Sequence, residues 1–250
     1  MIARAVALLV VLALLGAGCS LRADEPPEAT PSVTTPELVP VSDDVSHAER
    51  VRPPRLAADS AERRARRLTA RVRNVSCAGV IRGSGFALGP RLLVTNRHVL
   101  AGAEELEVST WDGRTFQVAS ATVGVLGDVG FARVEGRLPV VGAFGPPPQR
   151  GDIVTAVGYP RGGPLTLSEG SVVDRVDGGN LGVQGEVVRL TARVRPGNSG
   201  GPLLDRRGRV AGIVYAIERG TGFGLAIPVD TLRRLERAGG FEDVPPCGAE

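Results

Sequence analysis

Short apolar runs, separated by turns that contain glycine or proline, make up most of the chain after about residue 70. Alternating runs and continuous runs of valine, leucine and isoleucine are both typical of strands. In the first half the pattern predicts strands at residues 75–88, 91–95, 105–110, 115–119 and 129–134. In the second half it predicts them at residues 152–159, 165–176, 186–192, 201–204, 210–217 and 222–227.

Four other segments break this pattern. Residues 142–148 contain two glycines and three prolines, which predicts a connection between the two groups of strands. Residues 229–238, followed by Gly239, have the spacing of a C-terminal helix. Residues 57–70 are arginine-rich and helical in pattern, and we interpret their charges as a solvated face. Residues 20–56 have no apolar period and predict a linker.

Composition narrows the class of protein. Hydrophobic residues make up 42% of the 250 residues but aromatic residues only 4%, so we expect valine, leucine and isoleucine to fill the core. The net charge is +3 and all 30 basic residues are arginine, which we attribute to codon bias and not to nucleic-acid binding. The sequence contains no zinc-ligand cluster, phosphate loop or heptad run, so we expect no metal and no cofactor.

A glycine-rich loop holds a candidate nucleophile. Ser199 lies in the sequence Pro-Gly-Asn-Ser-Gly-Gly-Pro-Leu, residues 196–203, between two apolar runs. Glycine on both sides lets backbone N–H groups approach a ligand closely. The loop therefore has the composition of an oxyanion hole, for which we expect the N–H groups of Gly197 and Ser199 to be the donors.

A serine nucleophile needs a base, and the chain has two histidines. His47 lies in a polar segment after a proline-rich run, and we assign it no catalytic role. His98 follows the apolar residues 91–95 and precedes a short helical turn that ends at Gly102. Because a base at the end of a strand is held firmly, His98 is the candidate.

The base in turn needs a carboxylate to orient it. Asp128 comes directly before the alternating run of residues 129–134, a position from which a buried carboxylate can reach an imidazole. The other candidates lie at turns or strand ends, where an ordinary turn role explains them: Asp112, Asp152, Asp174 and Asp205.

Three motifs occur in the order His, Asp, Ser: Thr-Asn-Arg-His-Val at 95–99, Asp-Val-Gly-Phe-Ala at 128–132 and Gly-Asn-Ser-Gly-Gly at 197–201. Together they resemble the trypsin-like serine proteases of the chymotrypsin fold, in particular bacterial members similar to HtrA/Do and to the MarP-type membrane proteases. The resemblance covers roughly residues 70 to 230. α/β-Hydrolases and subtilisins have a different order of the three residues.

The resemblance implies an all-β fold of two six-stranded antiparallel β-barrels with a short C-terminal helix. It implies an endopeptidase in which Asp128 orients His98, His98 activates Ser199, and Tyr215, Ala216 and Ile217 pair with the substrate backbone. Its substrates would be proteins or peptides. Position 198 is asparagine where trypsin-type zymogens carry aspartate, so activation by that ion pair is not expected. The residues after Pro228 are too few for the PDZ domain of many HtrA proteases.

The N-terminal residues set the expected location. Arg4 precedes an apolar stretch at residues 5–15, and small residues lead to Cys19, which is the layout of a signal peptide. Residues 15–19, Leu-Gly-Ala-Gly-Cys, resemble a bacterial lipobox with Cys19 as the lipidated residue, although Gly16 stands where a larger apolar residue is usual. Simple cleavage near this point and an uncleaved anchor are the alternatives.

These features define the expected domains. Residues 1–19 are a signal peptide with lipobox, 20–68 a Pro/Ala/Arg-rich linker, and 69–241 the protease domain, with barrels at about 70–140 and 150–228; residues 242–250 are a tail. The linker would hold the protease clear of the outer face of a cell membrane. The oligomeric state is open.

Two further cysteines remain if Cys19 carries lipid. Cys77 and Cys247 would pair readily outside the cytoplasm, and the MarP-type proteases place cysteines similarly. A bond across so long a loop contributes about 5 kcal/mol in the chain-entropy model.

A protease fold without activity, used as an extracytoplasmic binding or stress-sensing module, is the alternative to an active enzyme.

Overall fold

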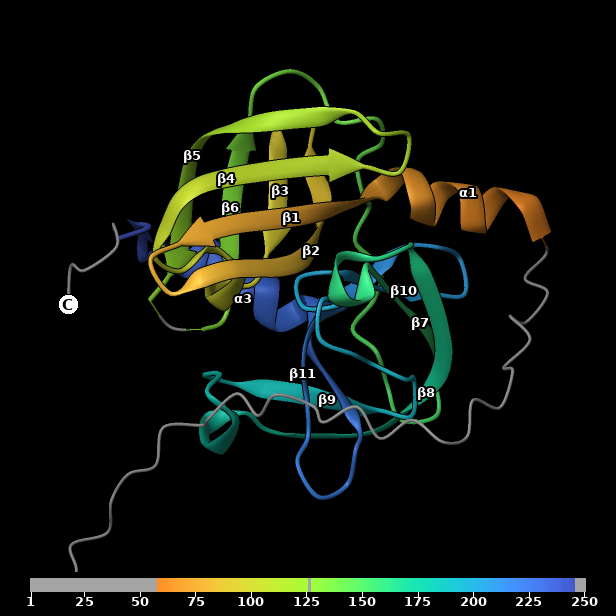
Figure 1. Ribbon diagram of the computed structural model, residues 1–250. Coiled ribbons are helices and arrows are strands. Elements are labelled where there is room, and N and C mark those ends of the chain that lie inside the picture. The colour runs from red at the N-terminus through yellow and green to blue at the C-terminus, as the bar shows by residue number, and fades with distance from the viewer. Residues whose placement is uncertain (1–57, 126, 246–250) are drawn as a thin grey trace, which may run out of the picture. The chain divides into compact units, whose positions relative to one another are not determined.

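The computed structural model describes residues 58–125 and 127–245, and Figure 1 shows that these residues form two β-barrels, one above the other. The expected signal peptide, Cys19, His47, most of the linker and Cys247 lie outside the described residues.

The first barrel closes from six antiparallel strands in the order β5-β4-β1-β2-β3-β6, with β5 also paired to β6. A short strand, β13 (Phe241–Asp243), adds to β5 from the C-terminal end of the chain. The barrel strands are β1 (Thr69–Ser76), β2 (Gly79–Gly89), β3 (Leu92–Thr95), β4 (Ala103–Thr110), β5 (Thr115–Gly124) and β6 (Gly130–Val134).

The second barrel is also closed and six-stranded, in the order β10-β11-β12-β9-β8-β7. Two short 3₁₀ turns lie in its hairpin loops. The loop between β9 and β10 carries the serine motif. The strands are β7 (Ile153–Gly158), β8 (Thr166–Asp177), β9 (Glu186–Leu190), β10 (Pro202–Asp205), β11 (Val210–Ile217) and β12 (Gly224–Pro228), and the turns are η1 (Pro160–Gly162) and η2 (Gly179–Leu181).

Three helices complete the described part of the chain. α1 (Ala58–Leu68) buries Ala65 and Leu68 and exposes its arginines, and α2 (Arg97–Leu100) is a single turn after β3. α3 (Val229–Ala238) follows β12 and buries Leu232 and Leu235 on one face. None of the described helices is long and apolar enough to cross a bilayer.

Aliphatic side chains fill the core, as the composition predicts. Phe86 is the largest fully buried side chain, and the others of that rank are leucine, isoleucine and valine. One buried cluster runs from Val72 and Leu93 of the first barrel to Ile213 and Ile227 of the second. The barrels therefore share a continuous core, which fixes the position of one barrel against the other.

The predicted architecture of two six-stranded antiparallel barrels and a C-terminal helix is confirmed. One predicted strand is wrong in detail, because residues 75–88 form a hairpin that turns at Cys77 and Ala78. The strand that was missed, β1, begins directly after α1, and its arginines obscure the alternation of the buried Ala70 and Val72. β13 was not expected, since its three residues carry no strand signal alone.

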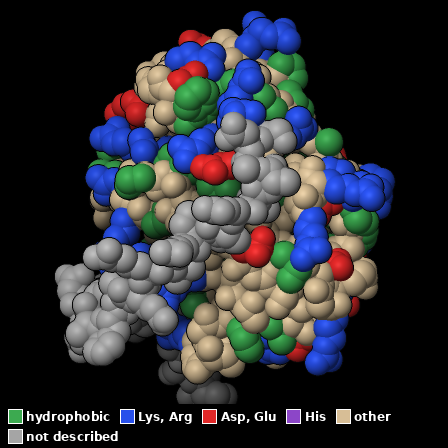
Figure 2. All heavy atoms as spheres, turned by 90° about the vertical axis from the view of Figure 1, so that its right-hand side faces the viewer, with side chains coloured by type: hydrophobic (Ala, Val, Ile, Leu, Met, Phe, Trp, Pro, Cys, Tyr) green, Lys and Arg blue, Asp and Glu red, His purple; other side chains and the backbone are tan. Residues whose placement is uncertain are grey.

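Arginine side chains are spread over the visible part of the face that carries α1. Figure 2 shows them among acidic and uncharged groups. On α1 itself Arg66 pairs with Glu62 at 2.6 Å, one helical turn away. Exposed pairs of this kind contribute little to stability.

Candidate active site

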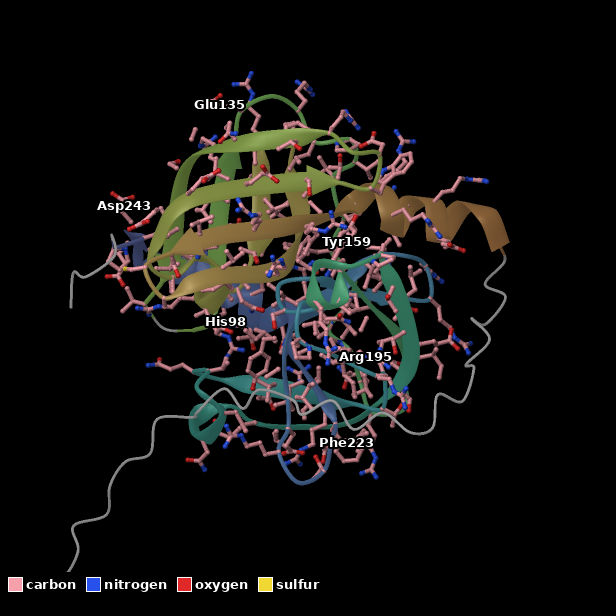
Figure 3. The ribbon with its side chains drawn as sticks, viewed as in Figure 1. His98, Glu135, Tyr159, Arg195, Phe223 and Asp243 are labelled. Atoms are coloured by element: carbon pink, nitrogen blue, oxygen red, sulfur yellow. The ribbon has the colours of Figure 1, made fainter. Side chains whose placement is uncertain are left out.

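Strand pairing brings His98 and Asp128 together. β3 pairs with β6 so that Thr95 lies opposite Gly130. His98 follows the end of β3 and Asp128 precedes the start of β6, so both side chains emerge at the same end of the first barrel. Figure 3 shows His98 between the first barrel and the second.

The two residues make two hydrogen bonds. His98 Nδ1 lies 2.7 Å from Asp128 Oδ2, and the backbone N–H of His98 donates to Asp128 Oδ1 at 3.0 Å. The His98 side chain is 38% exposed and that of Asp128 17%, so the carboxylate is largely shielded while the imidazole reaches solvent. A carboxylate bound to Nδ1 holds the proton there and leaves Nε2 free to act as a base.

Two buried asparagines support this pair. Asn96 Nδ2 donates to the backbone oxygen of Asp128 at 2.6 Å. Asn74 Nδ2 donates to the carbonyls of Val99 and Ala101, both at 3.0 Å, and thereby caps the turn of helix that carries His98. Both asparagines are fully buried, so these bonds are shielded from competition with water.

The serine loop of the second barrel packs against the segment that leads to His98. A Cβ atom at Gly200 would lie 2.2 Å from Thr95 Oγ1 and 2.1 Å from Ser84 O. A Cβ at Gly83 would lie 2.6 Å from Val99 Cγ1 and 3.2 Å from Ser199 O. Glycine is required at both positions because backbone and side chains approach so closely. The structure thus brings Ser199 beside the turn that carries His98.

The Ser199 hydroxyl donates to the backbone oxygen of Tyr215 at 3.2 Å. Among the hydrogen bonds of the described residues, none joins Ser199 to His98. Catalytic hydrogen bonds are often absent in ligand-free proteins and form only with substrate.

The carbonyls of the serine loop accept hydrogen bonds from backbone N–H groups. Pro196 O accepts from the N–H of Arg161 at 2.8 Å, and Asn198 O accepts from the N–H of Gly201 at 2.9 Å. The N–H groups of Gly197 and Ser199 donate to no acceptor within residues 58–125 and 127–245. Two unpaired N–H groups on either side of Asn198 are what an oxyanion requires.

The strand predicted to bind substrate has a free edge. β10 pairs with β11 only as far as Ile213, and a bulge separates Val214 from Ala216 in the pairing with β12. Ile217 is 38% exposed, whereas the Tyr215 side chain is buried and its hydroxyl donates to Leu181 O at 3.4 Å. Burial raises the pKa of Tyr215, and the nearby charges of Asp128 and Glu218 add to that effect.

The segment that leads into the serine loop is anchored by Val194. Val194 is buried, and a Cβ atom at Gly224 of β12 would lie 2.6 Å from its Cγ2. Arg193 and Arg195, on either side of Val194, are both exposed. Asn198, the uncharged residue before Ser199, is buried.

Sequence reasoning missed the residues that hold the serine loop in place. Ser84 of β2, fully buried, donates through Oγ to Gly197 O at 2.6 Å, and its N–H donates to Ser199 O at 2.8 Å. The signal was present as Gly83-Ser84-Gly85, since glycines on both sides of a strand residue indicate close backbone approach.

The remaining predicted positions are only partly described. Cys77 lies in the turn between β1 and β2, while its predicted partner Cys247 and the predicted lipidation residue Cys19 lie outside the described residues. Within the described residues no group of three or more His, Cys, Asp or Glu side chains is arranged to hold a metal ion.

A family model for the trypsin-like peptidase domain matches residues 83–213, which is more than half of the chain and includes His98, Asp128 and Ser199. The chain therefore belongs to the trypsin-like peptidase family.

Curated relatives and solved structures agree with this assignment. HhoA of Synechocystis sp. is 35% identical over 181 residues, which is 67% of this chain and 46% of that protein. Serine protease Rv3671c of Mycobacterium tuberculosis is 31% identical over 160 residues, which is 60% of this chain and 40% of that protein. The chain thus spans less than half the length of these relatives.

The crystal structure of the active form of Rv3671c protease from M. tuberculosis superposes with a TM-score of 0.68. The match covers 84% of this chain and 97% of that chain at 24% identity. At this identity the match establishes the fold.

Proposed function

We propose that this protein is an extracytoplasmic serine endopeptidase that hydrolyses peptide bonds through Ser199, His98 and Asp128 by way of an acyl-enzyme. The observation that carries the proposal is the 2.7 Å contact between His98 Nδ1 and Asp128 Oδ2. It lies beside a serine loop whose Gly197 and Ser199 N–H groups have no acceptor among the described residues.

The proposed reaction begins when the Ser199 hydroxyl turns from the Tyr215 carbonyl to Nε2 of His98. The imidazole takes the proton as Ser199 Oγ attacks the scissile carbonyl, and Asp128 stabilises the imidazolium that forms. The oxyanion accepts hydrogen bonds from the N–H groups of Gly197 and Ser199. His98 then protonates the leaving amine, and water attacks the acyl-enzyme by the same route in reverse.

The substrate would be an extended segment of protein or peptide. The free edge of residues 215–217 offers backbone groups for strand addition, in which main-chain hydrogen bonds bind any sequence and side-chain pockets select among them.

Labelling with a fluorophosphonate probe tests the proposed activity. The full chain should be labelled covalently at Ser199, as shown by mass spectrometry of the labelled peptide. Ser199→Ala should abolish labelling, whereas Ser120→Ala, an exposed serine of β5, should leave it unchanged. If the folded protein is not labelled, the alternative of a binding or sensing module replaces the enzyme.

We propose that the protein is tethered to the outer face of a bacterial membrane through Cys19. The support is the apolar stretch at residues 5–15 followed by the lipobox-like sequence that ends at Cys19. Metabolic incorporation of an alkynyl fatty acid that is lost in Cys19→Ala is the expected result. A mature N-terminus at another residue near this point would show simple secretory cleavage, and an N-terminus at Met1 would show an uncleaved anchor.

We also propose the Cys77–Cys247 disulfide. Cys77 lies in a turn of the first barrel, and β13 brings the C-terminal part of the described chain back to that barrel, where Val244 donates to Ala121 O at 3.1 Å. Mass spectrometry of oxidised protein should find the two cysteine peptides joined, and two free thiols would contradict the proposal.

A further inference from the structure

We propose that the Ser84 hydroxyl is a positioning group that keeps the oxyanion hole open before substrate arrives. Ser84 belongs to β2 of the first barrel, whereas Gly197 and Ser199 belong to the loop of the second. The inference rests on the proposed protease function and adds to it a residue outside the three motifs.

The Ser84 hydroxyl has one possible orientation. It lies 2.9 Å from the backbone nitrogen of Tyr159 and 2.6 Å from Gly197 O. The amide of Tyr159 can only donate, so the hydroxyl oxygen accepts there and its proton must point to the carbonyl of Gly197. The hydroxyl therefore holds the Gly197 carbonyl by a directed hydrogen bond.

This bond completes a set that holds every carbonyl from Pro196 to Ser199. Arg161 N–H holds Pro196 O, Ser84 Oγ holds Gly197 O, and Gly201 N–H holds Asn198 O. Ser199 O accepts from Ser84 N–H at 2.8 Å. Each peptide group of the loop is therefore fixed, and the N–H groups of Gly197 and Ser199 are left without an acceptor among the described residues.

Gly197 is the point where this arrangement is weakest. Its φ is +97°, and as a glycine it can adopt other backbone conformations at little cost. The Gly197 N–H shares a planar peptide group with Pro196 O, which the Arg161 N–H holds. Ser84 Oγ holds the next peptide group, that of Gly197 O, which lies between the two donor groups. Together the two bonds restrict the backbone torsions on both sides of the Gly197 Cα.

The surroundings of Ser84 fit this role. Ser84 is fully buried, and Thr95 Oγ1 donates to its carbonyl at 2.7 Å. A Cβ at Gly158 would lie 2.9 Å from Ser84 Oγ and 2.9 Å from the Cα of Asn198, so the hydroxyl lies where β7 and the serine loop approach each other closely.

The test compares the rate of fluorophosphonate labelling of the full chain with that of Ser84→Ala. We expect the maximal labelling rate to fall about 10- to 100-fold, while the probe concentration at half-maximal rate stays within about two-fold, because only stabilisation of the oxyanion is lost. The control is Thr231→Val on α3. It removes a buried hydroxyl that donates to Glu186 O of β9 at 3.3 Å. It should keep the wild-type labelling rate within about two-fold.

Labelling of folded Ser84→Ala at the wild-type rate would overturn the inference, and so would an equal loss in Thr231→Val. Wild-type protein that resists labelling would instead overturn the proposed function.

Amide hydrogen exchange of the wild-type chain tests the hydrogen bonds that hold the serine loop, without a variant and without activity. The Tyr159 amide should be protected, and the Gly197 and Ser199 amides should exchange rapidly. Equal exchange rates at these three amides would contradict the proposed hydrogen bonds.

Discussion

Asp128 contacts His98 twice, through Oδ2 to the imidazole Nδ1 at 2.7 Å and through Oδ1 to the backbone N–H at 3.0 Å. The first bond sets the tautomer of the ring and the second sets the position of the residue that carries it. A single carboxylate thus orients the base in two ways, which makes the pair sensitive to the loss of either oxygen.

Asp128→Asn should lower kcat for peptide hydrolysis on the order of 10³- to 10⁴-fold, because an amide nitrogen facing Nδ1 favours the wrong tautomer. The measurement is cleavage of a fluorogenic peptide or of labelled casein. Asp152→Asn is the matched control, since Asp152 only accepts from the N–H of Gln149 at 2.8 Å in an exposed turn. A comparable loss in both variants would show that Asp128 has no special role.

Gly200→Ala should prevent the serine loop from forming. The added Cβ would meet Ser84 O at 2.1 Å and Thr95 Oγ1 at 2.2 Å, in addition to the strain of a φ of +86°. We expect loss of labelling and a fall of several kcal/mol in the free energy of unfolding.

Gly113→Ala separates the two effects in this experiment. Gly113 has a φ of +80° in the β4–β5 turn, and a Cβ there would meet no atom within 4 Å. It should cost only about 1 kcal/mol and retain activity. If both variants lose the same stability, backbone strain and not close contact explains the glycine at 200.

Arg71→Leu should loosen η1, the 3₁₀ turn in which the N–H of Arg161 donates to Pro196 O. The Arg71 guanidinium lies 4.7 Å from the centre of the Tyr159 ring and donates to Gly163 O at 3.0 Å. Loss of both contacts should lower the free energy of unfolding by about 1–2 kcal/mol, measured by urea denaturation.

Arg133→Leu is the control for this substitution, because Arg133 is an exposed arginine of β6, away from the η1 turn. It should change stability by less than about 0.5 kcal/mol. If the Arg71 and Arg133 variants unfold at the same urea concentration, the ring contact contributes nothing.

Glu218→Gln should make stability less sensitive to acid. Hydrogen bonds from Arg189, the shorter at 2.6 Å, and from Thr221 lower the pKa of Glu218. A lowered folded-state pKa means that the ionised carboxylate stabilises the fold above the usual glutamate pKa, and that this contribution is lost as pH falls through the lowered value.

The wild type should therefore exceed Glu218→Gln in stability by about 1 kcal/mol at pH 7, and the two should converge as the pH falls below the usual glutamate pKa and through the lowered one. Thermal unfolding across this range provides the measurement. Glu169→Gln, an exposed glutamate of β8, should follow the wild-type curve throughout. A constant difference at every pH would point to packing and not to charge.

Local patterns in the sequence predicted most of the strands and the three motif residues, while the two-barrel architecture was implied by the family resemblance. Alternating apolar runs and glycine-bearing turns predict the strands, since strand periodicity is a property of neighbouring residues. Glycines around Ser199 and the helical turn after His98 likewise make each motif visible in a few residues. The boundary between β1 and β2 could not be predicted in this way, because arginines and a one-turn reversal at Cys77 interrupt the period.

Only the tertiary structure decided how the serine loop is held. Ser84 contacts Gly197 across 113 residues of sequence, and Tyr159 contacts Ser84 across 75. Such bonds depend on two closed barrels that are joined by one buried cluster, and no local period encodes them. The sequence by itself thus determined which residues carry the proposed chemistry, whereas the direction of each peptide group around Gly197 depends on contacts between barrels that only folding brings together.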